Sequence, residues 1–564
     1  MSRARTRAGL CFTAAVMAAC SIPAGGPSTQ VPSRSRYPGN LAKARPLTHA
    51  ERTKFTETSS YADVMQFIDS LKVLGAKVYV GSIGKTTEGR DIPFVVASRP
   101  LVTTPEEAKR LRRPIVYIQA NIHAGEVEGK EALQAQLRDL LFDDHANVLD
   151  SLILIAVPIY NADGNERFAD QARNRSEQNG PALVGTRANA QGFDLNRDYI
   201  KAEAPETVAS LAMFRTWDPD VFVDLHTTDG SYHGYALTYA ASLNPAAIFT
   251  VPFTRDTMLV DLRKTLLERH GFYLFDYGNF PREQGAPTAW ETYDSRPRFG
   301  TNYYGLRGRL SVLSEAYSHD PFLRRVASTY DFVAELLSYV AGNAEDVIDL
   351  TRQADSRTTG YGNDLRSAPS IPIRSKLASI KSGPIRVEEI VRSGDTVRYE
   401  AGLPRGVRRT GAVRDVEMPI YDRFTPTLSV PMPFAYAFPR DVGDSVVRRL
   451  VMHGVIVEEL QQPLDASVAT FTIDSSTMAA QPFQKHRERH LAGSWGAAES
   501  RSLPVGTYVV RTAQPLGILA MYLLEPASDD GFVDWNVLDP WVNDRTFPVV
   551  RIVQRVQARL RPTS

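Results

Sequence analysis

The sequence predicts an α/β fold, in which a mixed, mostly parallel sheet carries helices on both faces and a smaller β-rich C-terminal domain follows. Across residues 61–345, short apolar runs typical of buried strands alternate with segments of helical period. Beyond residue 370, alternating apolar and polar segments are separated by Pro and Gly. Because 564 residues exceed one ordinary domain, we predict two domains, 47–345 and 371–564, joined by a linker over 346–370.

The amino terminus differs from the rest of the chain. Three arginines, an apolar run and small residues precede Cys20, which predicts a secretory signal over residues 1–20 that is too short to span a bilayer. Cys20 resembles the lipidation site of a bacterial lipoprotein and could tether the protein to a membrane; the alternative is ordinary cleavage near Ala19. Residues 21–46 are rich in Pro, Ser and Gly and predict a flexible tether. We therefore expect export to the cell envelope.

Charge and cysteine content narrow the classes of partner and chemistry. The 65 basic and 64 acidic residues nearly cancel, so nothing in the balance predicts a nucleic-acid partner. The two cysteines are Cys11, inside the signal, and Cys20, so the mature chain has no disulfide. No G-x-S-x-G motif occurs, which disfavours a serine hydrolase.

The elements of the first domain follow from local patterns. Residues 61–74 place apolar side chains at helical spacing, and two strand-like segments follow. The apolar run 115–118 predicts a buried strand, and the chain becomes helix-forming after Gly129. Residues 166–192 are polar and predict a long loop. The remaining predicted strands are 76–83, 92–97, 151–160, 221–225 and 310–313, and the remaining helices are 130–142, 205–214 and 321–340, with one more helix and strand in 245–280.

Four polar side chains lie at the ends of three predicted strands. His123 and Glu126 follow one strand, His226 ends a second and Glu315 ends a third. In an open α/β sheet these positions face one crevice. Two His and one Glu are the protein ligands of a hydrolytic zinc site, and Glu315 is the candidate for moving the proton. The alternative is that Glu315 is a fourth ligand of a closed structural site, although such sites favour Cys.

Four motifs in order carry a family resemblance. They are H-x-x-E after a strand, R-x-N-x-x-G-F-D-L-N-R, a strand-terminal His, and S-V-L-S-E-A-Y-S. Over residues 50–345 this order resembles the zinc carboxypeptidase family, which includes carboxypeptidases A and B and bacterial relatives. The resemblance implies one Zn²⁺ per chain, held by His123, Glu126 and His226, and Glu315 as general base and acid.

The resemblance also implies roles for the second motif. Arg187 falls on the arginine that stabilises the oxyanion. Asn196 and Arg197 fall on the pair that holds the terminal carboxylate of the substrate, for which a guanidinium fork is suited. Asp194 matches the carboxylate that orients the first zinc histidine, here His123.

Some positions depart from the family pattern. The substrate-capping tyrosine has two candidates, Tyr303 and Tyr304, between which the sequence does not decide. Asp198 stands where relatives more often have Asn. Arg307 and Arg309 either form a salt-bridged turn or help Arg197 hold an acidic substrate.

The second domain shows no catalytic pattern. His453, His486 and His490 are not paired with carboxylates at strand ends, so we interpret them as structural or surface residues. Its predicted strands are 385–391, 396–401, 467–473 and 507–512, with one helix near 446–452.

The predicted function is a zinc metallopeptidase that removes residues from peptides with a free C-terminal carboxylate, outside the cytoplasm. An amidase or endopeptidase acting on cell-wall peptides, or a deacylase of N-acyl amino acids, would use the same chemistry and stays open. A non-catalytic binding protein on a degenerate peptidase fold would be expected to have lost a zinc ligand or the general base, and all four residues are present.

Overall fold

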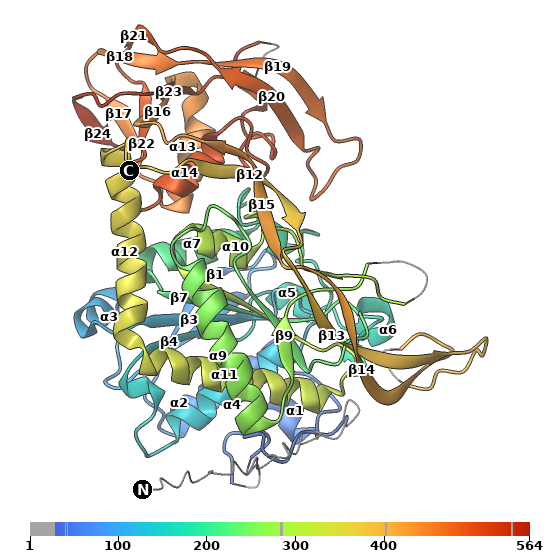
Figure 1. Ribbon diagram of the computed structural model, residues 1–564. Coiled ribbons are helices and arrows are strands. Elements are labelled where there is room, and N and C mark those ends of the chain that lie inside the picture. Colours follow the sequence, from blue (N-terminus) through green and yellow to red (C-terminus); the bar gives the residue numbers. More distant parts are fainter. Residues whose placement is uncertain are drawn as a thin grey trace, which may run out of the picture.

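The computed structural model describes residues 29–39, 41, 43–281, 286–400, 403–542 and 545–563 (Figure 1). Its centre is an eight-stranded sheet in the order β1-β2-β4-β3-β7-β11-β8-β9. The four middle strands β4, β3, β7 and β11 run parallel to one another. On one side β2 pairs antiparallel with β4, and on the other side β8 pairs antiparallel with β11. The strands are β1 (Tyr79–Lys85), β2 (Asp91–Ala97), β3 (Ile115–Ala120), β4 (Ile153–Val157), β7 (Val221–Thr227), β8 (Leu237–Ala241), β9 (Leu274–Asp276) and β11 (Leu310–Ala316).

Helices cover both faces of this sheet, which confirms the predicted fold class. Successive side chains of β3 alternate between two apolar layers: Val116 and Ile118 face one layer, Ile115 and Tyr117 the other. The first layer is completed by α2 (Tyr61–Val73), α4 (Glu128–Leu141), α9 (Leu259–Thr265) and α11 (Phe322–Gly342). The second is completed by α3 (Pro105–Leu111), α7 (Pro205–Trp217) and α10 (Gly300–Leu306).

The flexible tether predicted over residues 21–46 is wrong for its described part. Tyr37 is fully buried, and its ring packs 5.0 Å from the ring of Tyr330 on α11. Ser35 Oγ donates to Asp331 Oδ2 at 2.6 Å. Composition suggested disorder, but a few anchoring side chains hold this segment to the helix. The predicted signal and Cys20 lie outside the described residues, and no described helix is long and apolar enough to cross a bilayer.

The linker predicted over 346–370 is mostly helix. The helix α12 (Ala344–Asn363) runs along one side of the molecule between its two parts (Figure 1). Val347, Thr351, Ala354 and Thr358 recur at helical spacing and are buried. The polar residues that suggested a linker occupy the exposed face, so the connection is a rigid element.

The C-terminal region is β-rich, as predicted, with a seven-stranded antiparallel sheet in the order β21-β18-β23-β16-β22-β17-β24. It shares an apolar core with α7 and α10, because its helices α13 (Arg440–His453) and α14 (Gly517–Leu524) join that layer. A long hairpin, β13 (Lys381–Arg392) and β14 (Val407–Tyr421), reaches back to β10 (Trp290–Glu291). The other strands are β12 (Ile371–Ala378), β15 (Arg423–Val430), β16 (Ala435–Phe438), β17 (Glu458–Leu460), β18 (Leu464–Ala469), β19 (Phe471–Met478), β20 (Arg489–Trp495), β21 (Glu499–Leu503), β22 (Tyr508–Arg511), β23 (Val550–Ile552) and β24 (Leu560–Pro562).

Two strand predictions in this region are wrong. Residues 396–400 lie in the connection between β13 and β14 and form no strand, because Asp395 and Gly406 organise a turn there instead. The predicted strand 467–473 is divided between β18 and β19.

Candidate active site

The first two predicted ligands lie in a tight turn between β3 and α4. Asn121 opens the turn with φ +68°, a left-handed conformation that Asn tolerates better than most residues, and its Nδ2 donates to Ala124 O at 3.2 Å. Glu126 N donates to His123 O at 3.0 Å. The turn thus directs the His123 and Glu126 side chains to the same side.

The three predicted ligands converge. His123 Nδ1 lies 3.0 Å from Glu126 Oε1, and His226 Nδ1 lies 2.9 Å from Glu126 Oε2. The three side chains are buried and their ligand atoms lie within 4.8 Å of one another, and the described residues contain no other such group. Two imidazole nitrogens and a carboxylate fit the donor set of a zinc site that leaves a position open.

The outward nitrogen of each histidine faces a carboxylate. His123 Nε2 lies 3.0 Å from Asp194 Oδ1, as the resemblance implied for Asp194. His226 Nε2 lies 3.1 Å from Oδ2 of the fully buried Asp224, which the sequence analysis did not single out. Such partners leave each Nδ1 available for a metal.

The second motif surrounds the ligands as predicted. Asp194 Oδ2 accepts from Arg187 Nε at 2.9 Å, and Asp194 Oδ1 accepts from Asn196 N at 2.9 Å, which caps the short 3₁₀ turn Leu195–Arg197. The Arg197 guanidinium stacks 3.9 Å from the centre of the Phe299 ring. Within the described residues its one ion pair is a 4.0 Å contact with Asp194, so it remains available to an incoming carboxylate.

Glu315 completes the site from a neighbouring strand. It pairs in register with His226 across β11 and β7, so both strands continue past the predicted ends and carry these residues inside the sheet. Both residues line a cavity of about 60 Å³ together with Arg187, Asn196 and Arg197. Burial raises the pKa of Glu315 well above its usual value.

The comparisons with known proteins agree with this geometry. Residues 64–258 match the family described as zinc carboxypeptidase. This part of the chain is therefore similar to the zinc carboxypeptidase family. The matched residues include the three converging ligands, and Glu315 lies beyond them.

Full-length relatives and solved structures extend the comparison. The chain is 23% identical over 495 residues to carboxypeptidase 2 of Trichophyton tonsurans, covering 83% of this chain and 81% of the relative. It is 21% identical over 483 residues to carboxypeptidase 2 of Trichophyton rubrum, with the same coverage. A metallo-carboxypeptidase from Burkholderia cenocepacia is 22% identical, with a TM-score of 0.37 over 51% of this chain and 70% of that one.

Neither predicted capping tyrosine reaches the cavity that the ligands line. Tyr303 and Tyr304 are fully buried: Tyr303 OH bonds to His453 Nδ1 at 2.7 Å, and the Tyr304 ring stacks 3.7 Å from the Phe214 ring. The helix α10 turns both toward the apolar core. Tyr277 and Tyr293 line the cavity instead; the signal that could have found Tyr277 is its position directly after β9.

The salt-bridged interpretation is confirmed for Arg309, whereas Arg307 is held by hydrogen bonds to Tyr303 OH and His453 O. Arg309 pairs with Asp218 at 2.8 Å and Asp355 at 2.9 Å, and Arg307 donates to Tyr303 OH at 3.2 Å. Neither lines the cavity, so their proposed help to Arg197 is wrong. Three other polar residues considered in the sequence also form ion pairs. Asp198 pairs with Lys201, His486 with Glu203 and His490 with Asp534.

Arg175 is a residue that sequence reasoning missed. It is buried in the long loop before Arg187, and its Nη1 lies 3.1 Å from Glu126 Oε1, while its Nη2 donates to Thr227 O and Thr228 O. Burial alone would raise the pKa of Glu126, but the charges of His123 and Arg175 hold it well below its usual value. His123 and Arg175 therefore favour the charged form of Glu126. The loop of Arg175 carries no motif that could have revealed this residue.

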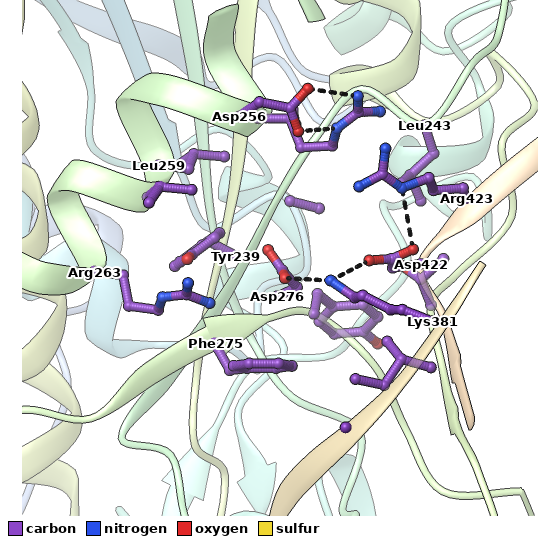
Figure 2. A pocket seen from close by; sticks show the side chains of 18 of the residues that line it. Tyr239, Leu243, Asp256, Leu259, Arg263, Phe275, Asp276, Lys381, Asp422 and Arg423 are labelled. Carbon is purple, nitrogen blue, oxygen red and sulfur yellow. Dashed lines mark hydrogen bonds and ion pairs between the residues drawn. The ribbon is translucent and has the colours of Figure 1, made fainter. Parts of the chain in front are cut away.

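A second, larger cavity of about 320 Å³ lies between β8, β9, α9 and the start of β13 (Figure 2). Its charged side chains pair with one another: Lys381 lies 2.9 Å from Asp422 and 3.9 Å from Asp276. Tyr277 lines both cavities. No predicted site residue lines the second cavity, so it stands apart from the converging ligands.

Proposed function

We propose that this protein is an exported zinc metallopeptidase that removes residues one at a time from the C-terminus of peptides. The observation that supports this proposal best is the convergence of His123, Glu126 and His226 beside Glu315 in one cavity, which Arg197 also lines. A non-catalytic binding protein would have no use for a buried carboxylate at that place.

The residues have separable roles in the proposed reaction. His123, Glu126 and His226 would hold a zinc ion, which would supply Lewis acidity for activating water and polarising the scissile carbonyl. Glu315 takes a proton from the attacking water and delivers it to the leaving nitrogen. Arg187 places a fixed cation beside the developing negative charge.

The rest of the cavity orients the substrate. Arg197 and Asn196 hold the terminal carboxylate, and Phe299 keeps the Arg197 guanidinium in its plane. Tyr277 and Tyr293 replace Tyr303 and Tyr304 as the side chains that cover the bound residue. An amidase, an endopeptidase or an N-acyl deacylase would cleave a bond at a different position relative to the carboxylate of the substrate. The position of cleavage therefore distinguishes these activities from the proposed one.

Metal analysis tests the ligand assignment. The wild type is expected to hold one zinc per chain, and His226→Ala should lose it because one of three ligands is gone. His145→Ala is the matched control, since the His145 side chain is 92% exposed and does not line the cavity. A full zinc complement in His226→Ala would overturn the assignment.

Export and anchoring are proposed from the first twenty residues alone. If Cys20 carries a lipid, Cys20→Ala should move the protein from the membrane fraction to the soluble fraction of the envelope. An unchanged distribution would leave secretion without a lipid anchor.

A further inference from the structure

We infer that the tip of the β19–β20 hairpin in the C-terminal region belongs to the catalytic apparatus, with Gln484 as a positioning residue for Asp194. The inference builds on the proposed function, because it assigns the C-terminal region a part in holding the same zinc site.

The contact joins two segments 290 residues apart in sequence. Asp194 N donates to Gln484 Oε1 at 2.9 Å. The carboxylate of the same Asp194 is shared between His123 Nε2 at 3.0 Å and Arg187 Nε at 2.9 Å. A displacement of the Asp194 backbone would therefore move a zinc ligand and the oxyanion arginine together.

The turn that presents Gln484 is costly for its sequence. Phe483 and His486 exchange backbone hydrogen bonds at 2.7 and 2.9 Å, so Gln484 and Lys485 are the two central residues of a tight hairpin. Both have positive φ, +48° and +69°, as in a type I′ turn, which favours Asn-Gly. A non-glycine residue in this region costs about 1 kcal/mol or more. Gln484 and Lys485 are thus both unfavourable at their positions in this turn. Strain of this kind persists where other contacts compensate for it.

Both strained residues contact the segment that carries the catalytic side chains. Besides the Gln484 contact, Lys485 Nζ lies 4.1 Å from the centre of the Phe193 ring. The next residue, His486, places Nε2 2.9 Å from Glu203 Oε2. The hairpin tip therefore grips both ends of the segment 193–203, in which Asp194, Asn196 and Arg197 lie.

Two substitutions at Gln484 in the full-length protein separate the hydrogen bond from packing. Gln484→Met keeps the length of the side chain and removes the acceptor, so zinc affinity should fall about tenfold. This is the lower end of the range of losses expected when a group that orients a metal ligand is removed. The kcat should fall by a similar factor while KM changes little. Gln484→Glu keeps an acceptor oxygen and should stay within about twofold of the wild type for both quantities. Gln461→Met is the control, since within the described residues the Gln461 side chain bonds only to Glu459 O.

A third variant tests the strained turn. Gln484→Asn combined with Lys485→Gly gives the residues that the turn prefers, so Tm should rise, while the shorter side chain cannot reach Asp194 N and zinc binding should weaken. Zinc affinity is measured by competition with a chelator, independently of activity. If Gln484→Met binds zinc like the wild type, if Met and Glu lose affinity equally, or if the stabilised turn keeps full affinity, the inference is overturned. A wild type that binds zinc but leaves peptide C-termini intact would contradict the proposed function alone.

Discussion

Glu315 shows how a strand position creates a catalytic group. Its register with His226 brings it to the metal ligands, and its burial disfavours the charged form, so the carboxyl group is suited to holding and releasing a proton. Glu315→Gln keeps the shape and removes the proton acceptor. We expect kcat to fall about a hundredfold or more, with zinc content unchanged. A variant that retains kcat would remove Glu315 from the mechanism, and one that loses zinc would make it a ligand.

The two tyrosine pairs predict opposite results. Tyr293 lines the cavity, so Tyr293→Phe should lower kcat/KM severalfold. Tyr303→Phe should leave kcat/KM unchanged and lower stability by about 1 kcal/mol, because it removes the buried hydrogen bond to His453. Steady-state kinetics and thermal unfolding of both variants check this. The reverse result would restore Tyr303 as the capping residue.

At the residue scale, the sequence predicts those parts of the site that depend on strand ends. His123, Glu126, His226 and Glu315 could be placed because a strand end fixes where a side chain points. Arg175 could not, since its role depends on which loop folds against Glu126. Asp224 was missed although it lies two residues before His226 on β7, where strand alternation puts both side chains on one face.

At the scale of elements, buried contacts outweighed composition. The helix α12 and the segment around Tyr37 have the polar composition of a linker and a tether, yet each buries a few side chains at the right spacing. Sequence patterns measure the average of a segment, whereas a few well-placed anchors determine whether it packs.

The ends of the elements also mattered. The core strands and helices were predicted to within a few residues, because apolar runs and helical periods are local signals. The prediction of a strand over 396–401 is wrong. Val397 and Tyr399 alternate with polar residues as in a strand, but both side chains lie exposed in the connection between the two strands of a long hairpin.

The contact between α14 and β12 gives a pH dependence. Asp529 Oδ1 accepts from Tyr522 OH and Oδ2 accepts from Ser375 N, and burial raises the pKa of Asp529 from 3.8 to about 7. Between these values the folded protein keeps a proton that the unfolded chain releases, so this group lowers stability as pH rises from about 4 to about 7. Asp529→Asn removes that loss.

Thermal unfolding of Asp529→Asn and of the wild type at about pH 5 and about pH 8 measures this loss of stability. The difference in Tm, variant minus wild type, should be larger at the higher pH, and any constant effect of the amide cancels. An equal difference at both pH values would show that Asp529 is already ionised in the folded protein.

At the scale of the whole molecule, the C-terminal region is continuous with the region that carries the candidate site. One apolar core includes α7 and α10 on one side and α13 and α14 on the other, and the hairpin tip reaches Asp194. The sequence predicts a β-rich region there but not this arrangement, because contacts between segments hundreds of residues apart leave no local pattern.

The central claim is that the cavity holds a peptide by its free C-terminal carboxylate and removes the last residue. Mass spectrometry of one peptide, supplied with either a free or an amidated C-terminus, tests it most directly. The zinc-loaded wild type should shorten the free peptide from its C-terminus one residue at a time and leave the amide nearly intact, and Arg197→Met should lose most of that discrimination. Cleavage at internal bonds, or equal cleavage of both peptides by the wild type, would contradict the account.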